Sequence, residues 1–185
     1  IDPHAFAPAP MPDTAARARI AQHYPQLAGN GPLLLLPGRG TRLKGHADAI
    51  ALLAQLRAGG VDARLWMPGA RQSERADYVR ELEQLAQAAD VADALAISAP
   101  TDAMRDAYAA CDLVLQLSRK PEAFGRTVLE ALAVGRPVLG WDHGGVGELL
   151  HQLFPQGAVP AFQISELTQR ARRLMAQPPA LPVTM

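Results

Sequence analysis

Short apolar runs alternate along the chain with longer segments in which apolar residues recur at helical spacing. The runs that suit strands lie at 33–36, 61–67, 94–98, 113–117 and 137–141. Each run is shorter than a typical helix and is flanked by glycine, proline or polar residues, a pattern that favours strands buried on both faces of a sheet. We therefore expect a sheet that is largely covered by other elements.

Helical periodicity is clearest between and beyond these runs. It predicts helices at 14–24, 46–58, 102–110, 126–134, from about 145, and at 166–176. A further helix is indicated by the spacing of Tyr78, Leu82, Leu85, Ala86 and Ala89. Thr101 is expected to cap the helix at 102–110. Strands that alternate with helices form βαβ units, so the pattern predicts an α/β, Rossmann-like, doubly wound parallel sheet of about six strands.

The first 31 residues differ from the rest because they begin with the proline-rich stretch IDPHAFAPAPMP, which has no periodicity. Such a composition is typical of a linker. The remaining length is enough for one domain with its own core. We therefore predict an interdomain linker or arm at 1–31 and one Rossmann-like domain at 32–185.

Composition excludes several classes of protein. The chain has 18 Lys and Arg residues against 18 Asp and Glu residues, so it shows no general attraction to nucleic acid or to an anionic membrane. No apolar run approaches the ~20 residues of a membrane-spanning helix. The apolar surroundings of Cys111, the one cysteine, predict a buried side chain rather than a nucleophile. No set of His, Cys and Asp residues is spaced as metal ligands are.

Ligands of doubly wound sheets bind beyond the carboxyl ends of the strands. Three predicted loops lie there, at 37–45, 118–127 and 140–146, and the polar and glycine residues gather in them. We therefore expect these loops to form the functional site.

The first of these loops reads PGRGTRLKG. It is not a P-loop, because Lys44 is preceded by Leu43, and it is not a dinucleotide fingerprint, because Leu43 also takes the place of the third glycine. Gly38 allows a turn, and Arg39 and Lys44 flank it with two cations that suit a diphosphate. A solvated turn with ordinary surface cations would explain the same residues.

The second loop contains two glutamates, Glu122 and Glu130, with seven residues between them. Gly125 permits close backbone approach, and the following helix begins at about Arg126, so its unpaired amides form a phosphate seat. Carboxylates repel phosphate, and their natural partners are sugar hydroxyls. An acid favoured near a helix start by the helix dipole is the alternative. The buried face of this helix is predicted to comprise Val128, Leu129, Leu132 and Ala133.

The third loop, within WDHGGVGELL, places Gly144 and Gly145 just before a helix. Their amides are expected to face the same ligand, although a plain glycine turn accounts for them equally well. His143 is interpreted as a polar loop residue, because no partner for acid–base chemistry is identifiable in the sequence.

These motifs carry a family resemblance. The motifs that carry the resemblance are GR followed by KG, the segment YAACD before a strand, EAFGRTVLEALAVGRPVLG and a later GG-x-x-E. Over about residues 32–150, the chain resembles the carboxyl-terminal domain of glycosyltransferase family 4 (group 1). The resemblance implies one half of a GT-B fold, which binds a nucleotide sugar. It also implies that an amino-terminal acceptor domain, with its catalytic histidine, is missing from this chain.

The resemblance assigns roles by position. Arg39 and Lys44 would neutralise the donor diphosphate and stabilise the departing nucleotide, Glu122 would hold the donor sugar, and Glu130 would bind the ribose hydroxyls. Further contacts are implied at the amides of Phe124, Gly125, Arg126, Thr127 and Val128. Ala123, where glycine is common in the family, and Ala99-Pro100, near the nucleobase position, depart from the family pattern.

The implied enzyme is a retaining hexosyltransferase that uses a UDP- or GDP-sugar, without a metal or another cofactor, and the fragment alone is expected to be inactive. The full-length protein would be cytoplasmic and peripheral to the inner membrane, in bacterial cell-envelope or lipopolysaccharide biosynthesis. A nucleotide-sugar epimerase half with the same fold, or a non-catalytic α/β nucleotide-binding module, remains an alternative from the residues alone.

Overall fold

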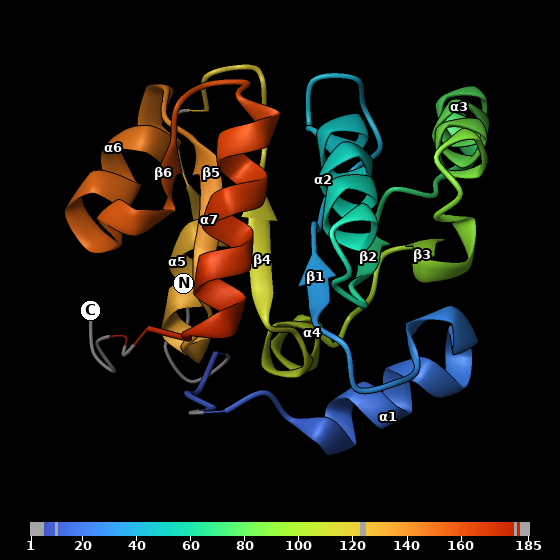
Figure 1. Ribbon diagram of the computed structural model, residues 1–185, viewed down its shortest axis with the longest axis horizontal. Helices are drawn as coiled ribbons and strands as arrows, with labels where there is room; N and C mark the ends of the chain where they lie inside the picture. The colour runs from blue at the N-terminus through green and yellow to red at the C-terminus, as the bar shows by residue number, and fades with distance from the viewer. Residues whose placement is uncertain (1–5, 10, 123–124, 180, 182–185) are drawn as a thin grey trace.

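A six-stranded parallel sheet with strand order β3-β2-β1-β4-β5-β6 organises the computed structural model, which describes residues 6–9, 11–122, 125–179 and 181 (Figure 1). The strands are β1 (Leu33–Leu35), β2 (Arg64–Pro68), β3 (Leu95–Ser98), β4 (Leu113–Gln116), β5 (Val138–Trp141) and β6 (Ala158–Val159). The order reverses between β1 and β4, which is the switch point of a doubly wound sheet. The predicted fold class is confirmed.

Seven α-helices are found among the described residues. They are α1 (Thr14–His23), α2 (His46–Ala58), α3 (Ala76–Ala88), α4 (Met104–Ala110), α5 (Arg126–Val134), α6 (Gly144–Leu153) and α7 (Ile164–Ala176). Helix α2 packs beside α7 on one face of the sheet, and α4 packs beside α5 on the other (Figure 1). Within the described part of the chain, no helix is both long and apolar enough to cross a membrane.

The core is built mainly from the strands and from the helix faces that cover them. Every residue of β1 is fully buried, as a central strand of a covered sheet requires. Cys111 is also fully buried, as predicted. Strand β2 begins three residues later than the pattern suggested. The Val61 amide still bonds to the Leu56 carbonyl at the end of α2, and Gly60 adopts a φ of +88°, so these residues close the helix instead of opening the strand.

Three further details of the helices differ from the prediction. Leu85 is 45% exposed on α3, because the buried face of this helix is formed by Val79, Leu82 and Ala86. In α5, Ala131 and Val134 are buried in place of the predicted Leu129 and Ala133, which are only partly buried. Helix α4 begins at Met104 after the N-cap Ala103, and the Thr101 hydroxyl instead accepts from the Ala103 amide in the turn before the helix.

The segment before β1 packs on the domain that follows it. Helix α1 contacts α4 and buries Ala16 and Ile20 in the common core. Ahead of the helix, the Ala9 amide donates to the Val134 carbonyl at 2.9 Å. Residues on both sides of the proposed boundary at residue 31 therefore share one packed body, and that boundary stays a prediction.

Candidate functional site

The loops after β1 and β4 meet at the switch point of the sheet. The Arg119 amide donates to the Leu43 carbonyl at 2.8 Å, which joins the two loops through their backbones. Gly45 has a φ of +92°, and a Cβ on it would lie 2.2 Å from the Leu117 carbonyl oxygen. Only glycine fits this close approach, so the sequence KG at 44–45 lets the first loop lie directly against the second.

Lys44 and Glu122 form an ion pair between these loops. Lys44 Nζ lies 2.6 Å from Glu122 Oε1, and the side chains are 35% and 23% exposed. The hydrogen bond from Lys44 holds the pKa of the Glu122 carboxyl below its usual range. The structure thus brings two of the predicted catalytic residues together as a charged pair, although they are 78 residues apart in the sequence.

A pocket of about 270 Å³ opens between the first loop, β4 and the start of α5. Its lining comprises Leu36, Pro37, Gly38, Arg39, Lys44, Leu115, Gln116, Leu117 and Thr127. Both predicted phosphate-binding cations therefore face one space. Thr127 brings the first turn of α5 to the same space, and the N-cap of that helix, Gly125, has no side chain with which to cap the free amides.

The other predicted residues at the start of α5 lie in different environments. Arg126 is exposed, whereas the Val128 side chain is fully buried in the core, so only the backbone of Val128 remains for a ligand. A Cβ on Gly125 would lie 2.7 Å from Leu149 Cδ2, so α6 packs closely against this glycine. Phe124, like Ala123, lies outside the described residues.

The third loop supports the second loop more directly than it faces the pocket. The Gly145 amide, which was expected to face the ligand, instead donates to the Glu122 carbonyl at 2.7 Å. Gly144 adopts a φ of +59° and lies against Pro121, where a Cβ would be 2.9 Å from the proline Cβ. His143 Nε2 donates to the Ser118 carbonyl at 2.8 Å. This loop therefore fixes the backbone that carries Glu122.

Glu130 lies on α5 and is not among the residues that line the pocket. Its side chain is 15% exposed, and Oε1 accepts a hydrogen bond of 2.9 Å from the Tyr108 hydroxyl. Its environment is therefore not that of a solvated acid on a helix surface. The structure brings Arg39, Lys44, Glu122 and Thr127 around the switch point, while Glu130 is held by α4.

Two supporting residues were not recognised in the sequence. His46, fully buried at the start of α2, donates from Nε2 to the Gly38 carbonyl at 3.3 Å, and burial lowers its pKa to about 4. Asp48 accepts two hydrogen bonds from Arg119, at 2.8 and 2.9 Å. In the sequence, both His46 and Asp48 are polar residues within the largely apolar segment 46–58, and this pattern could have indicated that they are buried.

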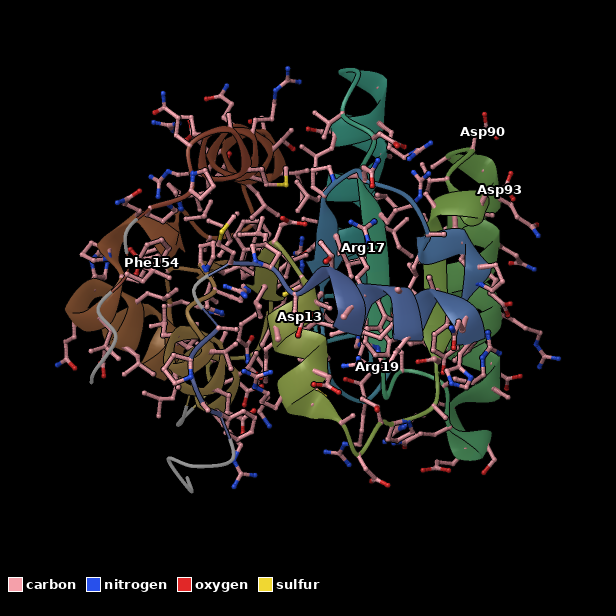
Figure 2. The ribbon with its side chains drawn as sticks, turned by 90° about the horizontal axis from the view of Figure 1, so that it is seen from below. Asp13, Arg17, Arg19, Asp90, Asp93 and Phe154 are labelled. Carbon is pink, nitrogen blue, oxygen red and sulfur yellow. The ribbon has the colours of Figure 1, made fainter. Side chains whose placement is uncertain are left out.

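A larger cavity, of about 530 Å³, lies at the opposite end of the sheet between α1 and the amino ends of β1 and β4. Asp13, the N-cap of α1, and Arg17 within α1 border it; Figure 2 labels both residues. The Arg17 guanidinium already donates to the carbonyl oxygens of Leu27 and Gly31. Because the cavity is remote from the carboxyl ends of the strands and its arginine is engaged, the smaller pocket is the better candidate site.

Comparison with known proteins places this geometry in a family. The family model described as glycosyl transferases group 1 matches residues 21–182. A lipopolysaccharide 1,2-N-acetylglucosaminetransferase of Salmonella typhimurium is 29% identical over 128 residues, which cover 67% of this chain and 34% of that protein. A 2-deoxystreptamine glucosyltransferase of Streptomyces kanamyceticus is 25% identical over 174 residues, covering 90% of this chain and 43% of that protein. The chain thus spans less than half the length of these relatives.

Solved structures show the same architecture. Anabaena HepE, solved in complex with UDP-glucose, is 25% identical with a TM-score of 0.78, covering 95% of this chain and 46% of that one. The C-terminal domain of a glycosyl transferase group 1 family protein from Francisella tularensis is 21% identical with a TM-score of 0.73. This second likeness covers 96% of the present chain and 88% of the Francisella chain, so the whole sheet corresponds to a carboxyl-terminal domain.

Proposed function

The chain belongs to the group 1 glycosyltransferases, and we propose that it is the donor-binding half of a retaining glycosyltransferase that requires no divalent metal. The observation that carries this proposal is the pocket at the switch point, which Arg39, Lys44 and Thr127 line together. Two cations and a helix start facing one space are the groups expected around a diphosphate.

Each side of the pocket has a role in this proposal. Arg39 and Lys44 bind the donor diphosphate and stabilise the negative charge that develops on it as the sugar leaves. Preorganised cations and helix amides can supply this stabilisation, which a bound metal supplies in other enzymes. Glu122, held charged by Lys44, accepts hydrogen bonds from the hydroxyls of the donor sugar.

The relatives support the choice of donor class. HepE binds UDP-glucose, and the Salmonella and Streptomyces relatives are named as sugar transferases. We propose a UDP- or GDP-hexose as the donor and a full-length enzyme in which an amino-terminal domain supplies the acceptor site. We further propose that this enzyme is cytoplasmic, peripheral to the inner membrane, and acts in cell-envelope or lipopolysaccharide biosynthesis.

Nucleotide binding provides the test. The melting temperature of the chain is measured with UDP, GDP, ADP and CDP, each in EDTA and in magnesium. At one hundred times its dissociation constant, a ligand adds about 2.7 kcal/mol to stability by mass action. We expect at least one nucleotide to produce this shift equally in EDTA and in magnesium. A shift seen only with magnesium would contradict the charge assignment, and no shift with any nucleotide would contradict the proposed function.

A further inference from the structure

Tyr108 of α4 contacts Glu130 of α5, the second of the two glutamates that the sequence singled out. Its hydroxyl donates to Glu130 Oε1 at 2.9 Å, although the two residues are 22 positions apart. Tyr108 is 1% exposed, and burial, with Glu130 nearby, raises the pKa of its phenol well above the usual range. The phenol therefore keeps its proton and acts towards the carboxylate only as a donor.

The phenol ring is itself fixed in place. The Phe6 ring contacts it edge to face, with 5.9 Å between the centroids. The Tyr108 carbonyl accepts from Arg136 Nε at 3.1 Å, and Arg136 is 2% exposed. A donor anchored through both its ring and its backbone determines where the carboxylate oxygen lies.

The two oxygens of Glu130 differ in their surroundings. Oε1 is engaged by Tyr108, whereas Oε2 lies 3.8 Å from Arg126 Nε, which is too long for a hydrogen bond. The Arg126 side chain is 79% exposed, so it does not hold Oε2 in the way that the buried Tyr108 holds Oε1. A glutamate that is otherwise free would lose rotamer freedom when it bound a ligand, and a fixed donor removes part of that cost before binding.

We propose that Tyr108 is a positioning residue, whose hydroxyl holds one oxygen of Glu130 so that the other is presented to a ribose hydroxyl of the donor. This inference rests on the proposed function, in which Glu130 binds the ribose. Tyr108 acts through Glu130 and does not contact the nucleotide.

The test compares Tyr108→Phe with the unsubstituted chain by calorimetry, using UDP and 2′,3′-dideoxy-UDP. Phenylalanine retains the ring, so the packing against Phe6 is preserved and the melting temperature checks it. We expect UDP to bind about tenfold more weakly, because a hydrogen bond to a charged group is lost. Dideoxy-UDP should bind unchanged. Tyr78→Phe, which removes a half-buried tyrosine hydroxyl on α3, is the matched control and should alter neither affinity.

Glu130→Gln separates this inference from the proposed function. If Tyr108 acts through Glu130, the double variant Tyr108→Phe/Glu130→Ala, in which no acceptor for Tyr108 remains at position 130, binds UDP no more weakly than Glu130→Ala alone. An effect of Glu130→Gln on UDP without any effect of Tyr108→Phe would overturn the role of Tyr108 and leave the proposed function standing. Equal loss for both ligands in Tyr108→Phe would make the residue merely structural. If the unsubstituted chain bound no nucleotide, both proposals would fall.

Discussion

Lys44 and Glu122 pair across the switch point of the sheet, with Nζ 2.6 Å from Oε1. The proposed phosphate cation and the proposed sugar ligand are thus direct partners, and a diphosphate bound by Lys44 competes with Glu122 for the same ammonium group. Occupation of the phosphate position and the position of the Glu122 carboxylate are therefore linked.

The first prediction concerns this competition. Glu122→Gln should strengthen the binding of UDP, because it removes a negative charge beside the diphosphate. The pair is partly exposed, so the gain should be modest, within about 1 kcal/mol or roughly fivefold in affinity. UDP-sugars should not share the gain, because the glutamine contacts their hydroxyls more weakly. Calorimetry with UDP and UDP-glucose measures both effects, and weaker binding of UDP would show that the carboxylate does not oppose the phosphates.

The second prediction concerns the cation. Lys44→Ala should weaken the binding of UDP by about 1.5–3 kcal/mol, the range for a hydrogen bond to a charged group, and should leave the binding of uridine nearly unchanged. The reason is that the contact exists only where phosphates are present. Arg80→Ala, which removes an exposed cation on α3, serves as the control. The same loss for UDP and uridine would mean that Lys44 acts through folding.

The third prediction concerns pH. His46 has a folded-state pKa of about 4, below its ordinary value of 6.5, because it is buried. The unfolded chain therefore takes up a proton at this residue between pH 6.5 and 4 while the folded chain does not, so stability falls as the pH is lowered through that window. The loss should reach about 3 kcal/mol. The free energy of unfolding, measured with urea at several pH values, should fall less steeply with decreasing pH in His46→Gln than in the unsubstituted chain. In His23→Gln, which alters an exposed histidine, it should fall as steeply as in the unsubstituted chain. The same pH dependence of the free energy of unfolding in the unsubstituted chain and in both variants would contradict the burial argument.

The fourth prediction uses two glycines with similar backbones. Gly45 and Gly60 have φ values of +92° and +88°, but only at Gly45 would a Cβ clash, with the Leu117 carbonyl oxygen. Both alanine variants carry the backbone strain of about 1–3 kcal/mol. Gly45→Ala should cost more in the free energy of unfolding and should also weaken nucleotide binding. Equal stability of the two variants would show that the loops can separate freely.

The fifth prediction concerns catalysis. The chain alone should transfer no sugar from a nucleotide sugar to lipid, sugar or polyol acceptors. Holding both substrates in position can lower the activation barrier by about 7–11 kcal/mol, and in the proposed function this chain holds only the donor. Product formation is followed by mass spectrometry. Robust transfer that Glu122→Ala abolished would show that these 185 residues contain a complete active site.

The order of elements and the three loops were predictable because alternating apolar runs determine the parallel sheet, and the sheet determines which loops share an edge. Strand β6, with two residues, was too short to produce a pattern. The Lys44–Glu122 ion pair and the hydrogen bond from the Gly145 amide to the Glu122 carbonyl depend on how the loops pack against one another. No local sequence pattern encodes this packing. Tyr108 belonged to a motif visible in the sequence, but its contact with Glu130 required the packing of α4 on α5.

The burial of Cys111 gives the protein an internal reporter of local opening. Its Sγ donates to the Tyr108 carbonyl at 3.3 Å, and burial raises the pKa of the thiol to about 12. A thiol that is neither ionised nor accessible reacts with alkylating reagents only when the structure around it opens. Because Cys111 is the one cysteine of the chain, its rate of alkylation follows the opening of the region beneath Tyr108. A nucleotide that stabilised this region would therefore slow the alkylation of Cys111, and the rate can be measured without introducing another cysteine.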